Sequence, residues 1–273
     1  MDTTKYGVAQ RNGALRGGSG EPLVLLHAGG ASPRLWEPVL PRLTAYRDVL
    51  APALLGNLGG RQLNSGPLSA RAIADDAERD LDAAGFGVVD VVGNSLGGFA
   101  ALELARRGRV RNLVAISPMG MQTSEKAEKL IRVLVRGHRV AVPAKPLVMP
   151  ALAVPVVRQR LLYTVLGVVH GERVPTALAR HLFHALTSCD VPAAFAAIEA
   201  ADLRIRDVGE ITTRTLLIRG TRDPIATRDQ IDGYSAGLPN ASLLELPGLG
   251  HCPQLEDPER VAAEILRFLG DES

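Results

Sequence analysis

The sequence is poor in the features that mark secreted, nucleic-acid-binding and membrane-spanning proteins. Its two cysteines, Cys189 and Cys252, stand far apart among 273 residues, which argues against a disulfide framework and fits a reducing compartment. The 31 basic and 29 acidic residues are mixed along the chain, without the basic blocks typical of nucleic-acid-binding proteins. The first residues are polar and lack an apolar signal region. We therefore expect a cytoplasmic protein that binds a small molecule, with neither nucleic acid nor a membrane as a partner.

An uninterrupted hydrophobic run is also missing. The chain is 46% hydrophobic and 22% charged, as is usual for globular proteins. Residues 140–156 are apolar enough to suggest a transmembrane helix, but Pro143, Pro146, Pro150 and Pro155 interrupt them. This segment is therefore predicted to be a buried or substrate-facing insertion.

Short apolar segments with strand character alternate with segments of helical spacing along most of the chain. The expected strands are 23–27, 49–51, 88–92, 113–116, 215–219 and 243–246, and helical spacing is found at 68–84, 98–107 and 261–269. Near-continuous apolar strands that alternate with helices are typical of a mostly parallel sheet with helices on both faces. The pattern predicts an α/β fold.

The alternation stops between about residues 121 and 205, where helical and proline-rich segments replace strands. We predict a core made of residues 1–120 and 206–273, with a helical cap inserted at 121–205 above the carboxyl ends of the strands, where ligands bind in open α/β folds. The insertion carries eleven basic residues against six acidic ones. An acidic substrate would explain this excess, but a solvated helical face is the simpler explanation.

Residues 93–97 have the sequence Gly-Asn-Ser-Leu-Gly and join an apolar strand to a helix. In this context Gly-x-Ser-x-Gly is typical of a nucleophile elbow, a sharp turn that exposes a serine hydroxyl. Gly93 and Gly97 leave room in the turn, because side chains there would collide. The alternative is a Gly-rich turn with an incidental serine.

A nucleophilic Ser95 requires a base, and the base requires an orienting acid; for this fold they follow in the order Ser, Asp, His. Asp223 follows the strand at 215–219, and His251 follows the strand at 243–246 in a Gly-rich loop. His251 would accept the Ser95 proton, and Asp223 would fix the imidazole tautomer. Taken singly, an Asp before Pro is common in turns, and a loop histidine is often a surface residue.

Two backbone N–H groups are predicted to stabilise an oxyanion. One belongs to Leu96, directly after the serine, and the other to Gly29, with Gly30 as second choice, in the loop after the strand that ends at His27. His27 is expected to support this loop by hydrogen bonds. No metal site is predicted, because His181 and His184 lack a neighbouring set of Asp, Glu or Cys residues.

With these motifs the chain resembles the α/β-hydrolase superfamily over essentially its whole length. The matching segments are His27-Ala28-Gly29-Gly30, Gly93 to Gly98, Gly220 to Pro224, Gly250-His251 and Leu255 to Pro258. The resemblance implies an eight-stranded, mostly parallel sheet with a helical cap, nucleophile Ser95, acid Asp223, base His251 and no cofactor. The Gly-Asn-Ser elbow is similar to that of hydrolases of meta-cleavage products, but Cys252 stands where those enzymes often have Trp.

The leading hypothesis is a cofactor-independent serine hydrolase that cleaves an ester, a thioester or an activated C–C bond of a small, mostly apolar molecule. Because residue 95 is a serine, the function of relatives with an aspartate nucleophile, such as epoxide hydrolases, is disfavoured. One alternative keeps the fold but makes the protein a biosynthetic lyase, cyclase or acyltransferase. Another is a ligand-binding receptor or pseudoenzyme. The substrate and the oligomeric state do not follow from the sequence.

Overall fold

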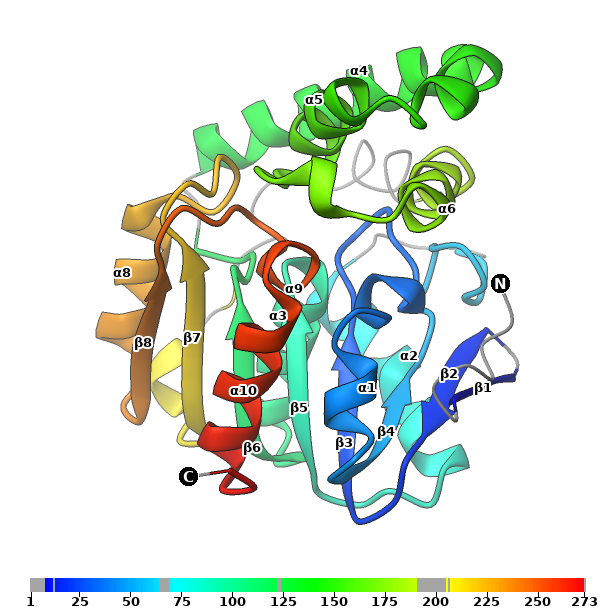
Figure 1. Ribbon diagram of the computed structural model, residues 1–273. Coiled ribbons are helices and arrows are strands. Elements are labelled where there is room, and N and C mark those ends of the chain that lie inside the picture. The colour runs from blue at the N-terminus through cyan, green and yellow to red at the C-terminus, as the bar shows by residue number, and fades with distance from the viewer. Residues whose placement is uncertain are drawn as a thin grey trace.

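A single twisted sheet forms the centre of the molecule (Figure 1). The computed structural model describes residues 8–11, 13–63, 69–121, 124–190, 205 and 207–272. Within these residues the sheet has eight strands in the order β1-β2-β4-β3-β5-β6-β7-β8. Strands β3 to β8 run parallel, whereas β2 pairs antiparallel with β4 and β1 antiparallel with β2. The predicted α/β fold with a mostly parallel sheet is confirmed.

The parallel strands are those expected from the apolar pattern, with small shifts of their ends. They are β3 (Glu21–Leu26), β4 (Arg47–Ala51), β5 (Val89–Asn94), β6 (Val110–Ile116), β7 (Arg214–Gly220) and β8 (Ala241–Leu246). The apolar pattern did not locate the antiparallel strands β1 (Val8–Arg11) and β2 (Ala14–Gly17), although the resemblance implied eight strands. Each has only four residues, so pairing with its neighbours rather than local pattern defines it.

Helices cover both faces of the sheet and create two separate cores. On one face α2 (Ala70–Ala83), α3 (Leu96–Arg106) and α8 (Arg228–Gly237) pack through Ile73, Phe99 and Tyr234. On the other face η2 (Pro33–Trp36), α1 (Leu40–Leu43) and α10 (Pro258–Leu269) pack through Trp36 and Ile265. Burial on both faces explains why the parallel strands have continuous apolar sequences.

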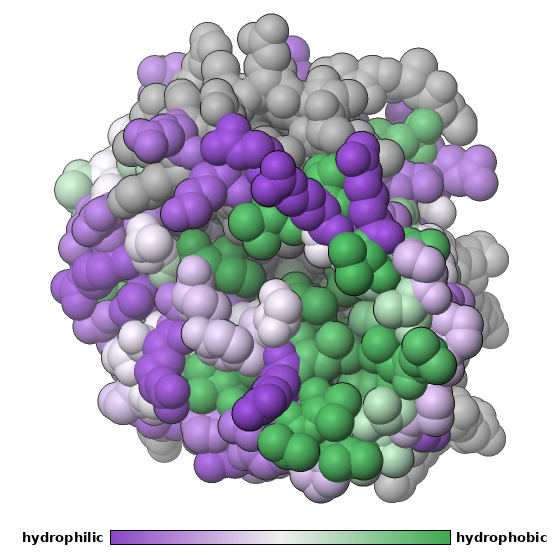
Figure 2. Space-filling model, turned by 90° about the horizontal axis from the view of Figure 1, so that it is seen from above, coloured by the Kyte–Doolittle hydropathy of each residue, from purple (hydrophilic) through white to green (hydrophobic). Residues whose placement is uncertain are grey.

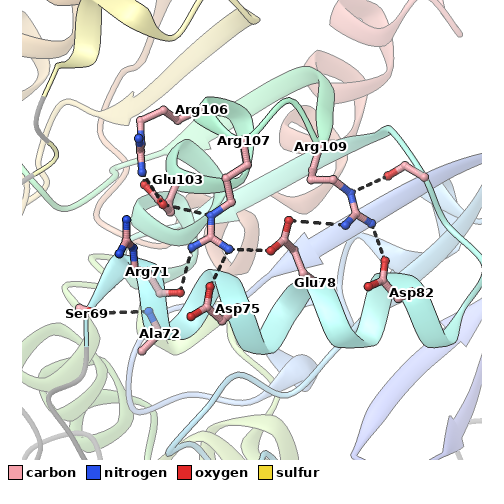
Figure 3. A network of polar contacts seen from close by, with 11 residues as sticks. Ser69, Arg71, Ala72, Asp75, Glu78, Asp82, Glu103, Arg106, Arg107 and Arg109 are labelled. Carbon is pink, nitrogen blue, oxygen red and sulfur yellow. Dashed lines mark hydrogen bonds and ion pairs between the residues drawn. The ribbon is translucent and has the colours of Figure 1, made fainter.

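Helices α2 and α3 are also joined by a network of arginines and carboxylates (Figure 3). Arg107, directly after α3, pairs with Asp75 at 2.7 Å and Glu78 at 2.6 Å on α2, and with Glu103 at 3.0 Å on α3. Ser69 caps α2, because its hydroxyl accepts the N–H of Ala72. The network fixes α3, whose first turn follows Ser95, against the body of the protein.

Between β6 and β7 the chain forms a helical layer over the carboxyl ends of the strands (Figure 1). It contains α4 (Ser124–Ala151), α5 (Pro155–Leu166), η3 (Gly171–Arg173) and α6 (Thr176–Leu186), and residues of α4, α5 and α6 contribute to a third apolar core. We call α4 to α6 the cap. Residues 191–204, which belong to the predicted insertion, lie outside the described residues.

The prediction that residues 140–156 are buried or face a substrate is wrong for most of the segment. It runs through the end of α4 into α5, and Val140 and Leu147 are 69% and 79% exposed. The three prolines of this stretch that fall within α4 do not end the helix.

Candidate active site

The Gly-x-Ser-x-Gly segment forms a strained turn between β5 and α3. Ser95 has a φ of 55° and a ψ of −111°, a conformation that is costly for a residue with a side chain and typical of functional sites. A Cβ atom on Gly97 would lie 2.1 Å from the carbonyl oxygen of Leu26, and one on Gly93 would lie 2.4 Å from that of Gly97. Both glycines are therefore required for the close approach of the backbone.

Asp223 and His251 meet at the carboxyl ends of β7 and β8. The two side chains are buried, and the distance from His251 Nδ1 to Asp223 Oδ2 is 2.9 Å. Asn94, the residue before Ser95, donates from Nδ2 to the carbonyl oxygen of His251 at 3.1 Å. The loop of His251 is thus attached to the turn that carries Ser95.

Asp223 is held in the ionised form by its surroundings. Burial alone would raise its pKa, but the nearby His251 and hydrogen bonds to the carboxylate outweigh burial and lower the pKa. Ser117 Oγ donates to Oδ2 at 2.7 Å, and the N–H groups of Ile225 and Ala226 donate to Oδ1 at 2.8 and 2.9 Å. A carboxylate fixed in this way can orient an imidazole and stabilise its protonated form.

The loop of His251 is fastened to the cap at two points. The N–H of His251 donates to the carbonyl oxygen of Gly167, directly after α5, at 3.0 Å. The buried carboxylate of Glu256 accepts the N–H of Gly250 at 2.8 Å and the N–H of His170 at 2.9 Å. Burial raises the pKa of Glu256, although these N–H groups oppose the shift.

Sequence reasoning did not assign this role to Gly167 or to Glu256. The only signal was the place of Glu256 in a segment that resembles the α/β-hydrolase superfamily.

Of the three backbone N–H groups predicted to face an oxyanion, those of Gly29 and Gly30 lie in the loop after β3 and that of Leu96 begins α3. Leu96 is the first residue of α3, where N–H groups have no partner within the helix. The N–H of Gly30, the second choice, already donates to Asn57 Oδ1 at 2.8 Å. Among the three predicted donors, Gly29 and Leu96 therefore remain the better pair.

His27 supports the loop through its imidazole, as expected. Burial lowers its pKa to about 4, so the ring is neutral near pH 7. Its Nε2 accepts the N–H of Leu54 at 3.1 Å, which leaves Nδ1 to donate to the carbonyl oxygen of Ala28 at 2.8 Å. The ring thus ties the loop to the segment after β4.

Several described cationic side chains of the cap face solvent or contact other parts of the cap. Arg160 on α5 and Arg222 beside Asp223 line a cavity of about 330 Å³ between cap and core. Arg136 and Arg139 are exposed on α4. The two cap histidines considered above for a metal site have other partners. His181 Nε2 lies 2.8 Å from Ser32 Oγ, and His184 Nδ1 lies 2.6 Å from Lys145 Nζ. Within the described part of the chain, no group of three His, Cys, Asp or Glu residues is arranged to hold a metal ion.

The parallel sheet, the strained serine turn and the helical layer over the strand ends define an α/β enzyme of the hydrolase class. The profile of the alpha/beta hydrolase family matches residues 23–264. The chain belongs to this family, and it is a hydrolase of this fold.

Relatives within the family act on different bonds. The chain is 29% identical over 211 residues to an epoxide hydrolase, EphH, of Mycobacterium tuberculosis, covering 74% of this chain and 95% of the relative. It is 31% identical over 254 residues to a pimeloyl-[acyl-carrier protein] methyl ester esterase of Aromatoleum aromaticum, covering 89% and 96%. The solved structure of a meta-cleavage product hydrolase from Pseudomonas fluorescens IP01 superposes with a TM-score of 0.70 at 20% identity, covering 97% of both chains.

Proposed function

We propose that the protein is a cofactor-independent serine hydrolase that cleaves an ester, a thioester or an activated C–C bond of a small, mostly apolar molecule. The observation that carries the proposal is the pairing of His251 with the ionised Asp223, in a loop bonded to the turn of Ser95. The methyl ester esterase supports the ester, and the meta-cleavage product hydrolase supports the C–C bond.

In ester cleavage, Ser95 Oγ would attack the acyl carbon while His251 Nε2 takes the hydroxyl proton. Asp223 would hold His251 Nδ1–H and stabilise the imidazolium. The N–H groups of Gly29 and Leu96 would bind the oxyanion, and His251 would return its proton to the leaving alkoxide. Water activated by His251 would then release the acid and restore the Ser95 hydroxyl.

Replacement of the candidate nucleophile tests the proposal. Ser95→Ala should abolish hydrolysis of a small ester and labelling by a serine-directed phosphonate. Ser117→Ala is the matched control: it removes a buried hydroxyl that contacts Asp223 rather than the acyl carbon, so the protein should still be labelled. Undiminished labelling of Ser95→Ala would refute the assignment.

Reaction in water enriched in oxygen-18 tests the chemistry separately. A hydrolase must place one solvent oxygen in the acid product. A product without the label would indicate a lyase, cyclase or acyltransferase on the same fold. A protein that reacts stoichiometrically with the phosphonate but does not turn over the ester would indicate a receptor.

A further inference from the structure

The cap carries an unusual concentration of exposed apolar side chains. Among the described residues ten large hydrophobic side chains are exposed, and eight of them lie on α4, α5 and the turn between these helices: Val133, Val140, Val142, Leu147, Val154, Val156, Val157 and Tyr163. Figure 2, which looks down on the cap, shows hydrophobic side chains gathered beside hydrophilic ones on this face. Concentrations of this kind mark contact surfaces, whereas scattered exposed hydrophobic residues do not.

Three of the four exposed apolar residues of α4, namely Val133, Val140 and Leu147, follow a helical repeat, whereas Val142 lies on another side of the helix. Val133, Arg136, Val140 and Leu147 are separated by three, four and seven residues, so they lie on one side of the helix. Val148 and Met149 pack against the core of the cap. The helix therefore has one apolar side that the protein covers and another that faces solvent.

The same region is strongly basic. From Lys129 to Gly171 the 43 residues include seven Lys or Arg and no Asp or Glu. Arg136, Arg139 and Arg160 are exposed beside the apolar side chains. Valine and leucine together with arginine on the exposed side of a helix are typical of helices that lie in the interface of an anionic bilayer.

We propose that the outer face of α4 and α5 binds the surface of an anionic phospholipid bilayer, with the helices lying along the interface. A second copy of the chain fits less well, because a two-fold interface would bring this basic face against itself. In the described part of the chain no helix is long and apolar enough to cross a membrane. The proposal revises the expectation that a membrane is not a partner, because the exposure of these side chains is not visible in the sequence.

Sedimentation of the full chain with vesicles tests the proposal. The protein should bind vesicles of phosphatidylcholine mixed with phosphatidylglycerol more tightly than phosphatidylcholine alone, and salt should release it. The double variant Val140→Asp, Leu147→Asp should bind roughly tenfold more weakly or worse, because it places charge in the apolar contact. Arg136→Gln with Arg139→Gln should weaken binding to the mixed vesicles by a similar factor.

Val88→Asp is the matched control, since Val88 is 59% exposed but precedes β5, at the end of the sheet away from the cap. It should bind as the wild type does. Circular dichroism and thermal unfolding verify that every variant folds. The proposal would be overturned if the wild-type protein stayed in the supernatant or if the cap variants bound vesicles as tightly as the wild type. It would also be overturned if the wild type were a dimer that Val140→Asp, Leu147→Asp converts to monomers.

The vesicle contact is independent of the proposed hydrolysis. Ser95→Ala should bind vesicles as the wild type does, and Val140→Asp, Leu147→Asp should hydrolyse a water-soluble ester at the wild-type rate. A loss of vesicle binding in Ser95→Ala would place the lipid in the catalytic pocket and overturn the surface assignment.

Discussion

At the scale of single residues, Ser95 shows how the fold maintains a strained conformation. A non-glycine residue with positive φ at a functional site costs of order 1–3 kcal/mol. The N–H of Ser95 donates to the carbonyl oxygen of Ile116 at 2.9 Å, and Asn94 donates to the same oxygen at 3.1 Å. Because neighbouring strand β6 holds both residues, the turn cannot relax without losing these bonds.

Asp223 offers a sharp test at this scale. Asp223→Asn keeps the size of the side chain but removes its charge, so His251 loses the partner that fixes its tautomer. We expect kcat to fall by a factor of about 10⁴ with little change in KM. Ser117→Ala removes one hydrogen bond to Asp223 and should reduce kcat far less. Steady-state kinetics on a soluble ester measures both, and equal effects would contradict the separate roles.

At the scale of elements, the turn after α5 acts on the loop of the proposed base. Gly167 has a φ of +63°, its carbonyl oxygen accepts the N–H of His251, and a Cβ there would lie 2.7 Å from His251 Cβ. The end of a cap helix and the loop of His251 are therefore in direct contact. A displacement of α5 would be transmitted to the imidazole.

Three glycine substitutions separate this contact from backbone strain. Gly167→Ala should lower both the melting temperature and kcat, because it adds a clash with His251. Gly108 has a φ of +74° and open space around it. Gly108→Ala should therefore reduce the free energy of unfolding only by the backbone strain, about 1 kcal/mol, and leave kcat unchanged. Gly137→Ala lies within α4 with nothing nearby and should stabilise the protein by about 0.5–1 kcal/mol. Thermal unfolding and kinetics measure these effects; wild-type kcat in Gly167→Ala would contradict the coupling.

At the scale of the whole molecule, two neutral histidines join separate parts of the chain. Burial lowers the pKa of His27 and of His181 to about 4. His27 ties the loop after β3 to the segment after β4, and His181 ties α6 of the cap to Ser32 of the core. Protonation of either ring would disturb contacts on which the relative placement of cap and core depends.

The pH dependence of stability follows from the sign of these shifts. Between pH 6.5 and about 4 the unfolded chain binds more protons than the folded one, so stability is full above pH 6.5 and falls as the pH decreases to about 4. We expect the free energy of unfolding in urea to be lower at pH 5 than at pH 7, with His27 contributing of order 2 kcal/mol. His181→Gln should lose less stability than the wild type over the same interval. Equal wild-type stability at both pH values would refute the expectation.

The parallel strands and the sharp turn at Ser95 could be predicted because each depends on local pattern. Continuous apolar segments gave β3 to β8, and glycine spacing gave the turn at Ser95. Strands β1 and β2 could not be found in this way, because each has only four residues and β2 joins the sheet through β4, a segment distant in sequence. The contact of Glu256 with the N–H of His170 could not be predicted from local pattern either, because the two residues are 86 positions apart.

The sequence by itself determined the chemistry that is available: a serine between glycines after a strand, then an aspartate and a histidine after later strands. Only the tertiary structure decided which N–H of the loop after β3 is already bonded, which cap residues hold the loop of His251, and which valines of α4 face solvent. The physical reason is that side-chain type and spacing are encoded locally, whereas burial and hydrogen-bond partnership arise between segments that meet only when the chain folds.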